Sequence, residues 1–362
     1  MTIAHYCIAH MCAILVFVRD NAKMIQSHVM KPFKYRSQVK AWFLLFRPWS
    51  YTATLVPFLV AAGISCHIPG CRWGYWALGL ASGLFFQATV NLLNTWGDEQ
   101  SGVDDVPGAI RTTPQIHDGL VSMRALLAAA LICAACAATI GTALCFYRAN
   151  GVWHVNYALL GAGFIGFLGS TNYSTGIKFK YHGLGVPFVS FLMGPLEIFV
   201  AIALLLPGHV QDILHATPLL PHLLVFIFFT LPIAALVGVI LHGNDMRDIP
   251  TDREAGIVTL ASRLGPQKAL AYYLICHALP YGIVLCLTVG TAPLAFRGEG
   301  STAVWFWLPL LALPLSIRTM VTATKVYRQN PDCPPWRGLE RTSGKILLLF
   351  GILYAATFAL MK

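Results

Sequence analysis

Two short acidic stretches stand at the ends of very apolar segments, far apart in the chain. The first runs from Asn94 to Asp105 and the second from Asn244 to Glu254, and together they hold eight of the 15 Asp and Glu residues. Carboxylates beside hydrocarbon are costly to desolvate, so their concentration indicates a bound cation or a reaction. We therefore look for chemistry in these two stretches first.

The first stretch places an amide and a carboxylate on one helix face. Asn94 and Asp98 are four residues apart, so in a helix their side chains lie one above the other. Asp104 follows beyond Gly102, on a segment that we expect to be a loop that folds back. The three side chains could then converge.

The second stretch repeats the pattern with a complication. Asp245 and Asp248 are three residues apart, and Asp252 follows four residues later. Pro250 disfavours a continuous helix through the residue before it. We therefore expect a broken turn, rather than regular helix spacing, to bring Asp248 and Asp252 together.

The side-chain types indicate a magnesium and phosphate site. Mg²⁺ prefers oxygen ligands, uses one or two carboxylates, keeps several waters and binds substrate phosphates. A metal ion and cationic side chains would together neutralise the charge of a leaving diphosphate. The basic residues near the two stretches are Arg111, Lys178, Lys180, Arg247 and Arg253.

An alternative interpretation is that these acids are ordinary solvated loop residues. Glu99 and Asp105 fit that description best, and Asp118 and Glu254 are placed to support helix starts. Two clusters that hold most of the acid in the chain weigh against this interpretation.

The composition is that of an integral membrane protein. The chain is 57% hydrophobic and 11% charged, with a mean hydropathy of +0.65, whereas soluble domains carry about 25% charged residues. A net charge of +10 would suggest nucleic acid in a soluble protein. Here the preference of cytoplasmic loops for Lys and Arg explains it, so membrane lipid is the expected surrounding and no nucleic acid partner is predicted.

Apolar runs separated by Gly, Pro and charged residues predict an all-α fold with nine membrane-spanning helices. The expected spans are 43–64, 74–97, 124–147, 152–171, 184–206, 220–242, 268–290, 303–323 and 344–361. We expect 39–362 to be one transmembrane domain. Residues 1–38 are expected to be an N-terminal extension, either disordered or partly helical.

The basic residues predict the orientation. With the segment before the first helix in the cytoplasm, 21 of the 25 Lys and Arg residues fall on the inner side. The second and sixth helices then both run inward and end at their acidic stretches. The two clusters therefore meet the same membrane face, where the negative ends of the helix dipoles require compensating cations.

The cysteines do not indicate a metal or redox site. Cys133 and Cys136 lie inside an apolar helical run without a nearby histidine, so we interpret them as packing residues. Cys66 and Cys71 flank a predicted outer loop and are either free thiols or a disulfide.

The acidic stretches resemble the motifs of the UbiA superfamily of intramembrane aromatic prenyltransferases. Asn94-x3-Asp98-x5-Asp104 is similar to the first aspartate-rich motif of that family, and Asp248-x3-Asp252 is similar to the second. Further stretches are similar to the branch that prenylates 1,4-dihydroxy-2-naphthoate in menaquinone biosynthesis. These stretches are 47–50, 91–95, 175–181 and 244–261.

The resemblance implies a fold and a reaction. The fold would be nine transmembrane helices around a central cavity, in a bacterial inner membrane with the active site facing the cytoplasm. The reaction would be a Mg²⁺-dependent transfer of a polyprenyl group from polyprenyl diphosphate to 1,4-dihydroxy-2-naphthoate, with loss of CO₂ and diphosphate.

The resemblance also implies roles for single residues. Mg²⁺ would be held by Asn94, Asp98, Asp245 and Asp248. The diphosphate would be bound by Lys178, Lys180 and Arg111. Asp104 and Asp252 would complete the catalytic chamber, as metal ligands or as partners of basic residues.

Three other functions compete with this one. The same reaction class could use another acceptor, such as 4-hydroxybenzoate, a chlorophyllide, haem or a lipid alcohol. A secondary transporter would show internal repeats and acids deep in the membrane, and neither is visible here. A non-catalytic scaffold would not need complete sets of metal-ligand residues at both clusters.

Overall fold

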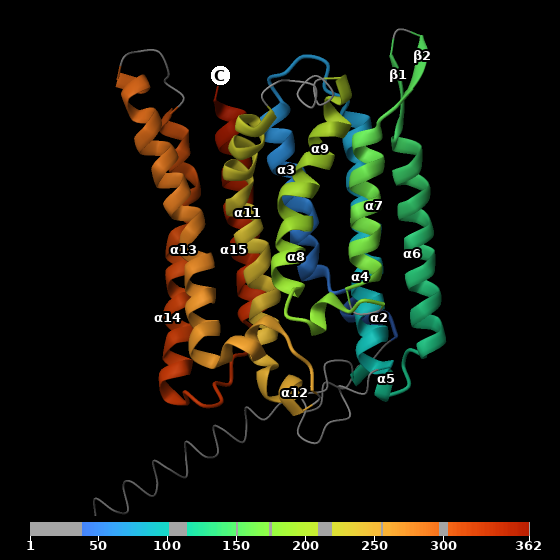
Figure 1. Cartoon of the computed structure of the whole chain (residues 1–362), viewed down its shortest axis with the longest axis vertical. Coiled ribbons are helices and arrows are strands. Elements are labelled where there is room, and N and C mark those ends of the chain that lie inside the picture. The colour runs from blue at the N-terminus through green and yellow to red at the C-terminus, as the bar shows by residue number, and fades with distance from the viewer. Residues whose placement is uncertain are drawn as a thin grey trace, which may run out of the picture.

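Long apolar helices run side by side through most of the chain (Figure 1). This computed structural model describes residues 38–100, 114–149, 151–173, 176–208, 219–254, 256–296 and 303–361. The helices are α2 (Gln38–Phe46), η1 (Pro48–Tyr51), α3 (Thr52–Ser65), α4 (Trp73–Gln100), α5 (Pro114–His117), α6 (Met123–Leu144), α7 (Tyr157–Thr171), η3 (Phe179–Tyr181), α8 (Gly185–Phe191), η4 (Leu192–Leu196), α9 (Glu197–Leu205), α11 (Leu219–Arg247), α12 (Ile249–Glu254), α13 (Leu260–Phe296), η5 (Ala303–Ala312), α14 (Leu313–Gln329) and α15 (Leu339–Leu360).

The predicted all-α membrane architecture is confirmed. Within the described residues, eight helical stretches are long and apolar enough to cross a membrane, and α7 supplies a shorter apolar helix over Tyr157–Gly169. The eight long stretches and α7 together match the nine predicted spans one for one. The chain is therefore a multi-pass integral membrane protein. The predicted extension lies outside the described residues except for Gln38, where α2 begins.

A small hairpin replaces the expected end of one helix and start of the next. Strands β1 (Phe146–Ala149) and β2 (Val152–Val155) pair antiparallel, with Phe146 opposite Val155. In the sequence, Asn150-Gly151 stands between β-prone residues, which is a strong hairpin signal that the hydropathy pattern obscured. The hairpin lies at the opposite end of the bundle from α5 and α12 (Figure 1).

Three local breaks in the helices shape the end that carries the acids. The chain is left-handed at Arg47 (φ 51°), just before Pro48, so α2 and α3 are separate helices where one was predicted. Gly265 (φ 74°) interrupts the start of α13. Asp248 separates α11 from α12.

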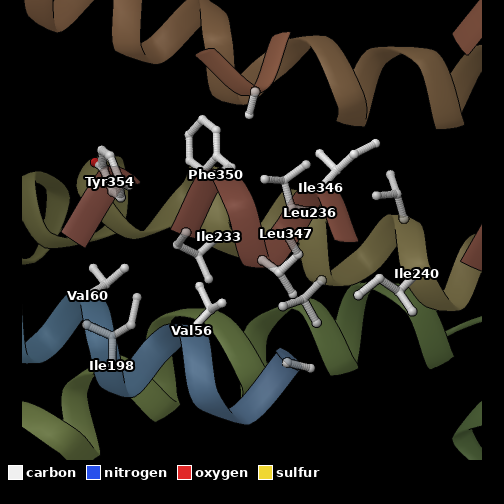
Figure 2. Close-up of a cluster of buried hydrophobic side chains, with 14 of the residues drawn as sticks. Val56, Val60, Ile198, Ile233, Leu236, Ile240, Ile346, Leu347, Phe350 and Tyr354 are labelled. Carbon is white, nitrogen blue, oxygen red and sulfur yellow. The ribbon is translucent and has the colours of Figure 1, made fainter. Parts of the chain in front are cut away.

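The core lies where α3, α9, α11 and α15 meet. Figure 2 shows Val56 and Val60 of α3 facing Ile198 of α9, with Phe350 and Tyr354 of α15 above them. α3 and α15 pack closely, and so do α11, α13 and α15. This packing fixes the positions of α11 and α15, which carry part of the site.

The thiols of Cys66 and Cys71 are both free. Each donates a hydrogen bond to a backbone carbonyl of the same turn, Cys66 to Gly63 and Cys71 to Ser65. The open question of a disulfide between them is thus answered in favour of free thiols.

Glycine allows the closest approach between α3 and α15. A Cβ atom at Gly63 would collide with the backbone carbonyl oxygen of Ala355, an atom that cannot move away independently of the helix. Small residues of this kind let transmembrane helices approach closely.

We predict that Gly63→Ala destabilises the protein by about 1–3 kcal/mol, because it overpacks the contact between α3 and α15. Gly161→Ala is the matched control, since a Cβ at Gly161 in α7 meets no atom within 4 Å. Thermal unfolding in detergent should show a lower melting temperature for Gly63→Ala alone. Equal melting temperatures for the two variants would contradict this packing.

Candidate functional site

The two acidic stretches reach the same end of the bundle. α4 ends at Gln100, two residues past Asp98, and α11 ends at Arg247, one residue before Asp248. α5 and α12, which follow α4 and α11 in the chain, both lie at this end (Figure 1). α11 extends five residues beyond the predicted limit of 242, so Asp245 lies on the helix itself.

At the end of α4, Asp98 is paired and Asn94 is not. The Nζ atom of Lys180 lies 2.8 Å from Oδ1 of Asp98, and the hydroxyl of Tyr181 donates to the same oxygen at 3.2 Å. The Oδ1 atom of Asn94 is buried and has no hydrogen-bond partner among the described residues. A buried acceptor without a donor is unfavourable, so this oxygen is available to a ligand. Glu99 turns away, toward His117 of α5.

The loop after α7 delivers Lys180 to Asp98. The amide of Lys180 donates to the carbonyl of Tyr173, and the amide of Phe179 donates to the carbonyl of Asn172. Gly176 takes a left-handed conformation (φ 55°) that reverses the chain at low cost. As a result, Lys180 points into the site.

Lys178 lies differently from Lys180. It is left-handed at φ 56°, its side chain is exposed, and its Nζ atom lies 5.7 Å from the centre of the Tyr181 ring. The two lysines predicted to act together are therefore not equivalent in this structure.

The second cluster sits on the break between α11 and α12. Backbone hydrogen bonds continue through it, from Asp248 to the Asn244 carbonyl and from Asp252 to the Asp248 carbonyl. Pro250 falls in the first turn of α12, where a missing N–H costs nothing. Asp248 does separate α11 from α12, but regular helix spacing, and not the predicted broken turn, relates Asp248 to Asp252. The hydroxyl of Thr251 donates to the Asp248 carbonyl rather than capping a helix.

Arg247 holds Asp248 with two hydrogen bonds. Its Nε and Nη2 atoms each lie 2.7 Å from one oxygen of the Asp248 carboxylate. On the other side, its Nη1 atom lies 3.3 Å from Asn244 and 3.8 Å from Oε1 of Glu340. The second oxygen of Glu340 is buried and has no hydrogen-bond partner among the described residues. Arg247 therefore lies between two carboxylates and fully engages only one.

Asp245 and Asp252 are the most buried acids of the site, 6% and 5% exposed. The hydroxyl of Thr259 donates to Asp252 at 3.0 Å. Burial first, and then the charges of Asp248 and Asp98, raise the pKa of Asp252 to about 7, although Thr259 and Lys180 act in the opposite direction. The charges of Asp98 and Asp248, one from each stretch, thus both act on the Asp252 carboxyl. The ends of the two stretches therefore line one polar chamber.

Lys180 is the central cation of this chamber. Burial alone would lower the pKa of Lys180, but the charge of Asp98 and the nearby Tyr173 and Tyr181 raise it above its ordinary value. Lys180 also interacts electrostatically with Asp245 and Asp252. Lys180 therefore stays positively charged, and its charge offsets the negative charges of acids in both clusters.

Some residues of the chamber were not among the predicted site residues. Tyr173 is 6% exposed, and burial and then the charge of Asp245 raise its pKa. Arg47 reaches α4 and donates to Thr95 at 3.3 Å. The basic and aromatic residues of 173–181 marked the right loop, but nothing in the sequence pointed to Glu340.

Two predicted residues lie outside the described part of the chain. Asp104 and Arg111 both fall in 101–113. Their predicted roles remain expectations.

The described residues suit a magnesium ion that binds together with a phosphate. No group of three or more His, Cys, Asp or Glu side chains within them is gathered as a metal site. Mg²⁺ does not need one, since it is commonly held by one or two carboxylates and substrate phosphates. The unpartnered oxygen of Asn94 and the carboxylates of Asp98, Asp245 and Asp248 provide hard oxygen ligands. Lys180 and Arg247 occupy two of these carboxylates in the absence of the ion.

Comparison with known proteins gives consistent matches. Residues 42–332 match the model of the UbiA prenyltransferase family. The chain is 30% identical to UbiA prenyltransferase domain-containing protein 1 of Gallus gallus over 91% of this chain and 89% of that protein. It is 28% identical to the protein of the same name from Homo sapiens, over 88% and 83% respectively.

A solved structure shares the fold. It is described as a UbiA homolog from Archaeoglobus fulgidus bound to GPP and Mg²⁺, and it aligns with a TM-score of 0.54 and 18% identity over 88% of this chain and 99% of that one. The family match favours an enzyme over the transporter and scaffold alternatives.

The comparisons correct the predicted acceptor. The relatives that align over most of the chain are animal UbiA prenyltransferase domain-containing proteins rather than bacterial dihydroxynaphthoate prenyltransferases. The prediction of 1,4-dihydroxy-2-naphthoate as acceptor in menaquinone biosynthesis is therefore wrong, and the alternative of another acceptor fits better. The sequence motifs support membership of the family, but they do not identify the acceptor.

We predict that the affinity for Mg²⁺ rises about tenfold between pH 6 and pH 8, because Asp252 must lose its proton before its charge can attract a cation. Asp252→Asn should flatten this rise. Glu254→Gln, an exposed acid two residues away, is the control and should keep it. Calorimetric titration of the substrate-free protein at each pH measures the affinity. An unchanged pH dependence in Asp252→Asn would contradict the assignment.

Proposed function

Because the chain belongs to the UbiA prenyltransferase family, we propose that this membrane prenyltransferase transfers a prenyl group from an allylic prenyl diphosphate to an electron-rich aromatic acceptor, with Mg²⁺ as cofactor. The observation that carries the proposal is the meeting of two carboxylate clusters around Lys180, a lysine that is only 18% exposed, together with the unpartnered oxygen of Asn94. Such a chamber suits a metal-bound diphosphate and has no evident use in a purely structural bundle.

The residues divide into a metal-binding set and a diphosphate-binding set. Asn94, Asp98, Asp245 and Asp248 would hold Mg²⁺ through oxygen atoms. Lys180 would donate to the diphosphate once Asp98 turns to the metal, with Lys178 and Arg111 as further donors. Asp252 would complete the catalytic chamber, and the same role is proposed for Asp104, which lies outside the described residues.

The reaction needs charge stabilisation at the leaving group. The bond between the allylic carbon and the diphosphate oxygen breaks, and both electrons leave with the oxygen. The aromatic ring attacks the allylic cation and then loses a proton, so the products are the prenylated ring, diphosphate and H⁺. Bound Mg²⁺ supplies Lewis-acid stabilisation of the diphosphate, and Lys180 and Tyr181 can donate hydrogen bonds to its developing charge.

The solved relatives support the donor class. Structures of the Archaeoglobus fulgidus homolog are described as bound to GPP and Mg²⁺ and to DMAPP and Mg²⁺. Both organic ligands are allylic diphosphates.

The membrane setting follows from the charge distribution. We propose that the chamber faces the cytoplasm, since Lys and Arg concentrate at this end, and that 39–362 act as one domain. At the opposite end of the bundle, Arg72 donates a hydrogen bond to the carbonyl of Arg148. Both arginines are among the four basic residues that the predicted orientation places on the outer side. The curated relatives are animal proteins, so a bacterial inner membrane is not retained.

Arg247 must move for the metal to bind. Both oxygens of Asp248 are held by its guanidinium, and Mg²⁺ would compete for them. Glu340 lies on the other side of Arg247, with one buried oxygen unpartnered. We propose that Glu340 accepts Arg247 when Asp248 turns to the metal, so that no buried charge is left alone.

We predict that Asp98→Asn and Asp248→Asn each lower prenyl transfer by at least about 100-fold, because each removes a charged metal ligand at the reacting diphosphate. The assay uses purified protein, Mg²⁺, geranyl diphosphate and a panel of phenols and hydroquinones. Asp118→Asn, an exposed acid at the same end, should stay near wild type. Undiminished product in both variants would refute the site, and no product from wild type with any acceptor would refute the aromatic acceptor.

We predict that Glu340→Gln weakens Mg²⁺ binding by about 10- to 100-fold, the range found for residues that support metal ligands. Arg247 would then have no second carboxylate and would stay on Asp248. Calorimetric titration of Mg²⁺ into substrate-free protein reports this directly. Glu340→Asp retains the charge and should recover part of the affinity, and an equal loss in both variants would show that Glu340 acts only through packing.

A further inference from the structure

A groove runs between α13 and α14, and the acidic chamber contributes none of its lining residues. It has a volume of about 520 Å³, within the range of about 300–1,000 Å³ typical of ligand sites. Ile275 and Ala278 of α13 and Met320 and Val321 of α14 form its apolar part, and Lys325 and Arg328 of α14 form its rim. The groove is therefore apolar along its walls and cationic at one end.

The apolar walls face outward. Ile275 is 64% exposed and Val321 is 46% exposed, and both belong to helices that span the membrane. In a bilayer such side chains contact acyl chains rather than water. The molecule that fills this groove must therefore present hydrocarbon to its walls.

The two basic side chains at the rim would attract an anionic group. Lys325 and Arg328 are three residues apart, so they share one face of the last turns of α14. Both are exposed, and neither forms an ion pair with any residue the structure describes. Lys325 stands one turn, about 6 Å, beyond Val321. That offset matches the passage from acyl chain to headgroup in a single lipid molecule.

The rim also lies at the right level of the membrane. α15 begins beside Arg247, where Glu340 contacts it, and 330–338 joins this point to the end of α14. The cationic end of the groove therefore lies at the same end as the acidic chamber, where Lys and Arg concentrate. Basic pockets between helices at this level bind anionic headgroups.

We propose that the groove between α13 and α14 is a binding site for an anionic glycerophospholipid, whose phosphate pairs with Lys325 and Arg328 while one acyl chain lies along Ile275, Ala278 and Val321. The lipid would cover exposed apolar surface on two helices at once. The site is separate from the catalytic chamber and does not depend on the proposed reaction.

The test measures lipid binding directly. Delipidated full-length protein is titrated with dioleoylphosphatidylglycerol or dioleoylphosphatidylcholine, and bound lipids are counted by native mass spectrometry. We expect phosphatidylglycerol to bind about 10- to 30-fold more tightly, from the contributions of two basic residues at the surface. Lys325→Ala combined with Arg328→Ala should abolish this preference, and equal affinities for the two lipids in wild type would overturn the proposal.

Two further variants separate a lipid site from general attraction of anions. Ala278→Phe fills the exposed groove while all charges stay, and it should lower phosphatidylglycerol binding as well. Arg124→Ala combined with Lys345→Ala removes two exposed positive charges outside the groove and should leave binding unchanged. Unchanged binding in Ala278→Phe, an equal loss in the control pair, or displacement of the lipid by millimolar inorganic phosphate would overturn the proposal.

Discussion

The chamber depends on neutralising carboxylates that lie at the negative ends of two helices. Asp98 and Asp248 stand where the dipoles of α4 and α11 disfavour negative charge, and both side chains are only partly exposed. Each acid has a cation at 2.7–2.8 Å, Lys180 for Asp98 and Arg247 for Asp248. Loss of either cation would leave a partly buried charge alone, which costs far more than the pair itself contributes.

The fold supplies these cations from a distance. Lys180 is 82 residues from Asp98 and reaches it because hydrogen bonds tie the loop after α7 to the end of that helix. Arg247 is the last residue of α11, and α11 packs against α13 and α15. The close contact of Gly63 in α3 with α15 and the core shown in Figure 2 fix α3, α11 and α15 relative to each other. Stability of the bundle and charge balance in the chamber are therefore linked.

The same balance explains how the chamber can accept a ligand. Lys180, which neutralises Asp98, is the group that we propose to bind the diphosphate, and Asp98 would then be free to bind the metal. A metal ion and a diphosphate that bind together carry opposite charges, so the total charge of the chamber would change less than on binding of either one alone. We propose the equivalent role for Glu340, whose second carboxylate oxygen is buried and has no donor among the described residues, so that it could accept Arg247.

The sequence by itself determined the membrane class, the number and order of the spans, and the two acidic stretches, because hydropathy and residue spacing are local properties. It also indicated the break at Asp248, since Pro250 constrains its neighbour whatever the fold. It did not reveal the hairpin at 146–155, whose turn signal lay inside apolar sequence. Only the tertiary structure decided that Lys180 and not Lys178 pairs with Asp98, that Arg47 reaches Thr95, and that Tyr173 and Glu340 belong to the chamber. These contacts join residues far apart in the chain, and their formation depends on how whole helices pack.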